Sequence, residues 1–141
     1  MEISKQTKLI SGILLLTIPS IQYGGIYLLS LLSRSDESYI ANPVRQGLFR
    51  AGHAHAGVLV ILSLVCQLFA DSTSGPSWAI WIARLGTPVA AVLIPLGFFV
   101  SVASPQATRP GNFILSAYIG VAALGLSVLS LGILLVRSGI R

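Results

Sequence analysis

Four long apolar stretches constrain this chain more than any other feature of its sequence. They cover about residues 9–32, 50–70, 78–103 and 112–136, and each is long enough for the roughly 20 residues of a membrane-spanning helix. Inside a bilayer only helices and closed barrels satisfy every backbone polar group, and these unbroken runs lack the alternation of barrel strands. With 54% hydrophobic and 9% charged residues, the sequence predicts an all-α integral membrane protein with one four-helix transmembrane domain over residues 1–141.

The segments around these stretches indicate how the helices follow one another. The first stretch is preceded by Lys5 and Lys8, but it is about 24 residues long and no small-residue cleavage pattern follows, so we expect it to be retained. The loops at 71–77 and 104–111 are short and predict antiparallel neighbours. Small residues four apart, Ser116 and Gly120 and then Ala123 and Ser127, predict a close helix contact along the fourth stretch.

The positive charges favour one orientation by a small margin. Five of them fall on the side of the termini and four on the other: Lys5, Lys8, Arg84, Arg137 and Arg141, against Arg34, Arg45, Arg50 and Arg109. If arginines of the first loop serve a ligand, the bias places both termini in the cytoplasm, in a bacterial inner membrane. The net charge of +5 suits anionic lipid, and no basic stripe with interleaved aromatics indicates a nucleic acid.

Other groups in the spans have ordinary explanations. Arg84 follows Trp78 and Trp81, which mark an interface, so we expect its side chain to snorkel toward the headgroups. Cys66 is the one cysteine, which excludes an intrachain disulfide. Pro88 and Pro95 are expected to kink the third helix.

The two histidines, His53 and His55, lie at the start of the second stretch, within Arg-Ala-Gly-His-Ala-His-Ala-Gly. The apolar residues beyond them number only 13, so the helix must recruit residues 50–57 and carry both imidazoles a little below the membrane surface. Polar groups at that depth are expensive and usually functional, and imidazole is the commonest protein ligand for metals. Residues separated by two positions point about 200° apart around a helix. The two histidines are therefore poorly placed to chelate one ion, but the spacing is compatible with one axial haem ligand.

The neighbouring residues leave alternatives open. The histidines are also explained as interfacial groups hydrogen-bonded to loop carbonyls. Gly52, Gly57 and the alanines around them make room for a flat macrocycle or equally for another helix. Arg50 is suited to a lipid phosphate and equally to a carboxylate such as a haem propionate.

The order of these features resembles the styrene oxide isomerases and their four-helix relatives, which are small membrane haem b proteins. That family opens its second helix with Arg-Ala-His-Ser-Gly, similar to His53-Ala54-His55-Ala56-Gly57 here. Its third helix ends in Gly-Phe-aromatic and then Ser-Pro, like Gly97-Phe98-Phe99 and Ser104-Pro105. Its fourth begins after residues similar to Pro110-Gly111-Asn112. The likeness is collinear over about 100 residues.

The resemblance implies that His55 ligates the iron of haem b in a homo-oligomer, which would be a trimer. It also implies a reaction in which ferric haem, as a Lewis acid, opens a small apolar epoxide, and a 1,2-hydride shift then gives an aldehyde. Two departures weaken that reaction. The family's substrate-side asparagine corresponds to Ile61, and its catalytic tyrosine falls near Phe98 or Phe99, so we expect these three residues to line an apolar substrate pocket. Tyr23 and Tyr118 are candidates to supply the missing hydroxyl.

Two further functions remain open from the sequence. One is a non-catalytic haem protein for electron transfer, gas sensing or haem storage, and the other is a metal-free membrane scaffold or transporter subunit. Two axial histidines, with His53 supplied by a neighbouring subunit, would favour electron transfer. One histidine with a vacant sixth position would favour catalysis or gas binding.

Overall fold

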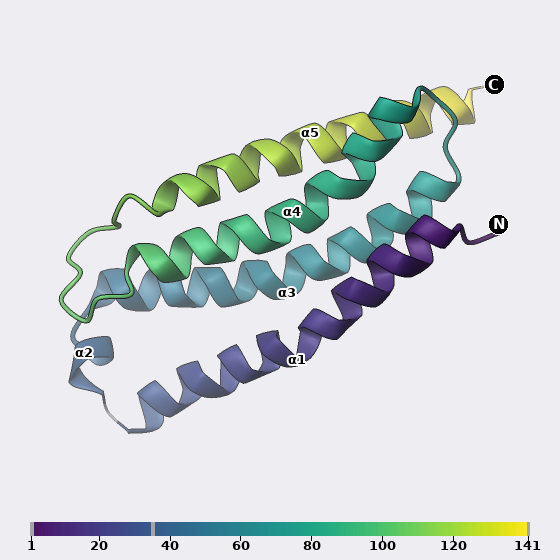
Figure 1. Cartoon of the computed structure of the whole chain (residues 1–141). Helices are drawn as coiled ribbons and strands as arrows, with labels where there is room; N and C mark the ends of the chain where they lie inside the picture. The colour runs from purple at the N-terminus through teal and green to yellow at the C-terminus, as the bar shows by residue number, and fades with distance from the viewer. Residues whose placement is uncertain (1, 35, 141) are drawn as a thin grey trace.

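The chain folds into four long helices and one short helix, and it contains no strand in the part described, residues 2–34 and 36–140 (Figure 1). This computed structural model has α1 at Lys5–Ser33, α2 at Glu37–Ile40, α3 at Pro43–Asp71, α4 at Ser77–Ser101 and α5 at Ile114–Gly139. All four long helices have the length and the apolar composition needed to cross a membrane. The prediction of an all-α integral membrane protein is therefore confirmed.

The second long helix begins seven residues earlier than the predicted start at residue 50. The Asn42 side chain accepts a hydrogen bond from the Arg45 amide at 3.0 Å, and Pro43 occupies the first turn, where its missing N–H costs nothing. His53 is therefore about 15 Å along α3 from Pro43 rather than in the first turn. Hydropathy correctly predicts the apolar part of α3. The residue at which the helix begins is set by the Asn42 cap, which lies in a polar segment.

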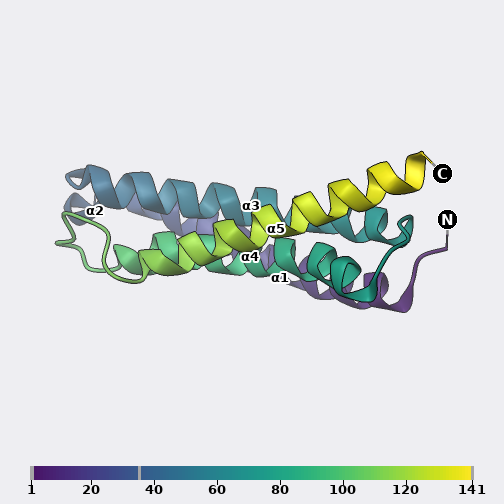
Figure 2. The same cartoon turned by 90° about the horizontal axis from the view of Figure 1, so that it is seen from above.

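The long helices run side by side, with α1, α3, α4 and α5 following one another across the molecule and both termini at one end (Figures 1 and 2). The most extensive packing is between α4 and α5, followed by that between α3 and α4 and then that between α1 and α3. Because α1 and α5 are the outer helices, each leaves a large share of its apolar side chains exposed.

The contact between α4 and α5 is close enough to exclude larger side chains. A Cβ atom on Gly120 would lie 2.7 Å from Cγ1 of Ile94, and one on Gly97 would lie 2.6 Å from the Ala117 backbone nitrogen. The Ser127 hydroxyl also donates to the Ala83 carbonyl at 2.8 Å. These contacts confirm the close helix contact predicted from the small residues and place it within the chain.

At the end far from the termini, α1 and α3 diverge and α2 fills the space between them (Figure 1). Tyr39 of α2 is fully buried, in a cluster with Leu28, Leu31, Phe49 and Val102. Arg45 is also buried, with its guanidinium 4.9 Å from the centre of the Phe49 ring and a 3.1 Å hydrogen bond to the Ser38 hydroxyl. This arginine is therefore part of the folded core at this end.

Asp36 precedes α2, and its backbone carbonyl accepts hydrogen bonds from the Tyr39 amide at 3.0 Å and the Ile40 amide at 2.8 Å. Its carboxylate accepts a hydrogen bond from the Ser38 hydroxyl at 2.6 Å, and this bond lowers the pKa of Asp36. Residues 36–42 are thus held by local hydrogen bonds as well as by the buried Tyr39.

Candidate ligand sites on the two sides of α3

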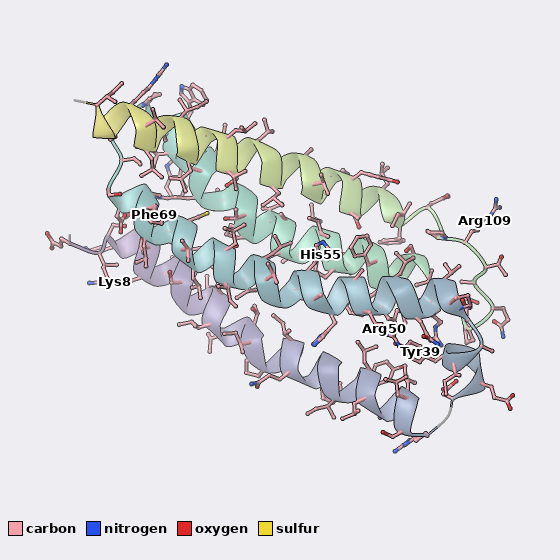
Figure 3. The ribbon with its side chains drawn as sticks, turned by 180° about the vertical axis from the view of Figure 1, so that it is seen from behind. Lys8, Tyr39, Arg50, His55, Phe69 and Arg109 are labelled. Atoms are coloured by element: carbon pink, nitrogen blue, oxygen red, sulfur yellow. The ribbon has the colours of Figure 1, made fainter. Side chains whose placement is uncertain are left out.

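His55 projects from α3 on the side that meets α4, where it is exposed and lies against Phe98 (Figure 3). The two rings are 5.3 Å apart, edge to face. Its Nδ1 atom is 2.7 Å from the carbonyl oxygen of Ala51, one turn earlier in the helix. A carbonyl can only accept, so Nδ1 is the donor in this contact, and the neutral ring then has its lone pair on Nε2. Metal-ligating histidines commonly have this arrangement, in which the second ring nitrogen donates to a backbone carbonyl.

His53 lies on the other side of α3, against the glycine pair of α1. A Cβ atom on Gly25 would be 3.0 Å from Cε1 and 3.1 Å from Nε2 of this imidazole, and one on Gly24 would be 3.7 Å from Nδ1. Neither ring nitrogen makes a hydrogen bond to any residue the structure describes. The two histidines thus face different helices, as the 200° separation predicts, and they cannot bind one ion together in a single chain.

A groove of about 270 Å³ opens beside His53, between α1 and α3. Its lining combines mainly apolar residues with two polar side chains: Ile18, Ile21, Gln22, Gly25, His53, Gly57, Val60 and Ile61. A Cβ atom on Gly57 would meet nothing within 4 Å, so this glycine faces open space. We call this space the α1–α3 groove.

Arg50 lies on the same side of α3 as His53, because residues three apart share a helix face. Gly57 follows His53 by four residues and lines the α1–α3 groove. Of the residues predicted to hold a cofactor, His55 therefore stands apart from Arg50, His53 and Gly57.

The predicted substrate residues lie in different surroundings. Ile61 lines the α1–α3 groove, whereas Phe98 packs against His55. The ring of Phe99 meets Phe49 at 5.4 Å and lies 3.0 Å from where a Cβ atom on Gly52 would be. Within one chain, therefore, Phe98 lies beside His55 and Ile61 does not.

The tyrosines proposed to replace the missing phenol are on the surface. Tyr23 is 71% exposed and Tyr118 is 67% exposed. The tyrosine with a fully buried hydroxyl is Tyr39, whose oxygen has no hydrogen-bond partner in the part of the chain described. Sequence reasoning passed over Tyr39 because it lies between the apolar stretches, in a segment expected to be a loop.

Arg84 does not snorkel toward the headgroups, which corrects the expectation from its neighbouring tryptophans. It is buried and forms an ion pair with Asp71, and it donates to the Thr7 hydroxyl at 2.6 Å and to the Gln67 side-chain oxygen at 3.3 Å. Asp71 also accepts from the Ser4 amide at 3.0 Å. The guanidinium stays inside because these partners from α1 and α3 satisfy it there.

These five residues, Ser4, Thr7, Gln67, Asp71 and Arg84, form what we call the polar clasp. It joins the start of α1, the end of α3 and the first half of α4. The signal for it in the sequence was the acidic Asp71 at the end of an apolar stretch, 13 residues before Arg84. A carboxylate and a guanidinium at matching ends of adjacent antiparallel helices can pair without reaching the headgroups.

No three side chains of His, Cys, Asp or Glu gather into a metal-binding group among the described residues. Cys66 is buried alone. A haem needs less from the protein than a bare ion does, since the porphyrin supplies four of the ligands and one histidine can supply a fifth. Of these requirements, His55 supplies one imidazole nitrogen, on an exposed ring whose Nδ1 faces the Ala51 carbonyl.

Comparison with known proteins returns no match. No family model matches the chain, and neither the curated proteins nor the solved structures give a match.

Proposed function

We propose that this chain is a membrane haem b protein in which His55 is the axial ligand of the iron. The observation that carries the proposal is the orientation of that imidazole: Nδ1 donates to the Ala51 carbonyl, and the ring is exposed, with Nε2 available as a ligand. The resemblance of residues 53–57 to the haem-binding segment of the styrene oxide isomerases supports the same residue.

The proposal assigns different roles to the residues around the two histidines. Phe98 packs against the His55 ring and would limit its rotation. Arg50, His53 and Gly57 face away from His55, so they would meet a haem only if a neighbouring subunit supplied it. The proposed assembly is a homo-oligomer in the bacterial inner membrane, a trimer by the resemblance, with both termini in the cytoplasm.

Haem content after purification tests this proposal. We expect the protein to copurify with haem b from haem-replete cells, His55→Ala to lose it, and His53→Ala to retain most of it. The measurement is the absorbance of the Soret band per mole of purified protein. A colourless wild-type preparation would reject the haem and favour the metal-free scaffold.

A bound ferric haem would supply Lewis acidity, and on that basis we propose isomerisation of small epoxides as the activity. The chain's own contribution near His55 is apolar, because Phe98 packs against its ring, and the family's tyrosine falls near Phe98 or Phe99. Removing a donor from a site of developing charge costs on the order of 10² to 10³ in rate. We therefore expect styrene oxide to give phenylacetaldehyde far more slowly than a true styrene oxide isomerase does.

The second candidate is a non-catalytic haem protein for electron transfer, gas sensing or haem storage. The exposure of Tyr23 and Tyr118 favours it, since among the described residues the aromatic ring against His55 is that of Phe98. The two candidates differ in one experiment. Phenylacetaldehyde formation with an epoxide-induced Soret shift supports the isomerase, and a Soret band that epoxides leave unchanged supports the non-catalytic protein.

A further inference from the structure

The α1–α3 groove combines apolar walls with polar groups. Its walls are mostly aliphatic, yet His53 and Gln22 place hydrogen-bonding groups in them. The half-buried His53 imidazole has no hydrogen-bond partner among the described residues, although polar side chains in membrane-spanning segments usually pair with other polar groups. The chain therefore presents hydrogen-bonding groups from two residues to whatever occupies the groove.

The groove is open to the lipid rather than to the interior of the bundle. Ile61 on its wall is 63% exposed, and Gln22 is exposed as well. Gly57 provides the open space, and Gly25 lets the imidazole lie directly against the backbone of α1. Because α1 is an outer helix, a molecule dissolved in the bilayer can enter from the side.

The size of the groove limits what fits. A cavity of about 150 Å³ holds a benzene-sized molecule, so 270 Å³ accommodates one substituted ring with part of an alkyl chain. Neutral imidazole and a primary amide each offer an N–H donor, and a carbonyl oxygen is the simplest partner for such donors.

We propose that the α1–α3 groove binds a lipid-soluble carbonyl compound with a single ring and an alkyl chain, of the alkyl benzoquinone type. His53 and Gln22 donate hydrogen bonds to the carbonyl oxygens, and the aliphatic walls contact the ring and the chain. Because His53 and His55 lie on different sides of α3, this binding does not depend on a haem at His55.

Photolabelling tests the site. The probe is an alkyl benzoquinone with a diazirine on its chain, added to the full chain in phosphatidylcholine nanodiscs, and the labelled residues are located by mass spectrometry. We expect labelling on the groove residues of α1 and α3, and excess unlabelled alkyl benzoquinone should compete with it. A competitor of the same length with a plain benzene ring should compete about 25-fold less well, because it loses both net hydrogen bonds.

Substitutions test whether the probe is bound in the α1–α3 groove. Gly57→Leu fills open space without a clash and should abolish labelling, whereas Gly125→Leu, on α5 with equally open surroundings, should leave it unchanged. His53→Leu and Gln22→Leu should each weaken competition by unlabelled benzoquinone about five-fold. The elution profile in detergent shows whether each variant is folded.

Three results would overturn the site. They are labelling that survives in folded Gly57→Leu, equal competition by the benzene compound, and labelling confined to α4 and α5. Equal competition would show an unspecific lipid groove. Loss of labelling in His55→Ala would instead tie the groove to the haem, whereas a colourless protein that still binds the quinone would reject only the proposed haem.

Discussion

We call the contact between α4 and α5 the α4–α5 seam and the contact between α1 and α3 the α1–α3 seam. Both contain glycines, but the glycines have opposite surroundings. In the α4–α5 seam a Cβ atom on Gly86 would lie 2.6 Å from the Ala123 carbonyl oxygen, so backbone fills the space. In the α1–α3 seam the neighbour of Gly25 is an imidazole ring, and Gly57 has no neighbour within 4 Å.

This difference shows what a small residue in a membrane helix does and does not specify. A glycine permits close approach, but the facing helix determines whether the space is filled by backbone, by a side-chain ring or by a ligand. In the α4–α5 seam serine hydroxyls such as that of Ser127 bond to facing carbonyls and close the gap. In the α1–α3 seam the helices diverge, and a polar imidazole is left beside a groove.

Disrupting the polar clasp should lower the stability of the protein most, because the clasp holds the end of the molecule at which α1 stays close to α3 and α4. Arg84→Ala leaves the buried carboxylate of Asp71 without its guanidinium. We expect a loss of about 3–5 kcal/mol in the free energy of unfolding, measured by denaturation in detergent.

Arg137→Ala is the matched control, because that arginine is exposed near the end of α5. It should change the free energy of unfolding by less than about 0.5 kcal/mol. An Arg84→Ala protein as stable as the wild type would show that the clasp does not hold the helices together. The double variant Arg84→Met with Asp71→Leu should recover much of the loss, because no unpaired buried charge remains.

An intermediate effect should distinguish the two seams directly. Gly120→Leu forces a side chain against Ile94, and overpacking of this kind costs about 1–3 kcal/mol. Gly57→Leu enters open space and should cost less than about 0.5 kcal/mol. Thermal unfolding of the two variants in the same detergent measures the difference. If Gly57→Leu were the more damaging, the α1–α3 seam would be the tighter of the two.

The smallest effect is expected at Tyr39, beneath the diverging ends of α1 and α3. Its hydroxyl is buried without a partner in the described residues, so Tyr39→Phe removes an unsatisfied group. We expect the stability to stay within about 0.5 kcal/mol of the wild type or to rise. A loss above about 1.5 kcal/mol would mean that the hydroxyl has a bonding partner, such as a buried water.

Much of the fold could be predicted from hydrophobicity, since the four apolar stretches correspond to α1, α3, α4 and α5. The start of α3 could not, because the Asn42 cap and Pro43 extend the helix into a polar segment that hydropathy reads as loop. The burial of Tyr39 and Arg45 escaped for the same reason. The short helix α2 makes its apolar contacts in the space between the diverging ends of α1 and α3. Those contacts depend on the tertiary structure, so hydropathy along the chain does not reveal them.

The candidate sites were predicted in part. Helix geometry placed His53 and His55 on different sides, and the structure confirms that separation. Which neighbour each histidine would meet depends on long-range packing, so the groove that His53 shares with Gln22 of α1 was not foreseen. Arg84 was misplaced because the Trp residues nearby indicated an interface, whereas its actual partners come from helices that are distant in sequence.

The central claim is that His55 alone ligates the haem, with His53 turned toward α1. Electron paramagnetic resonance of the purified ferric protein tests this most directly, because the spin state of the iron reports the number of strong axial ligands. One histidine with a weak or vacant sixth position predicts a high-spin signal, which His53→Ala leaves unchanged. A low-spin signal typical of two axial histidines, converted to high spin by His53→Ala, would contradict the claim.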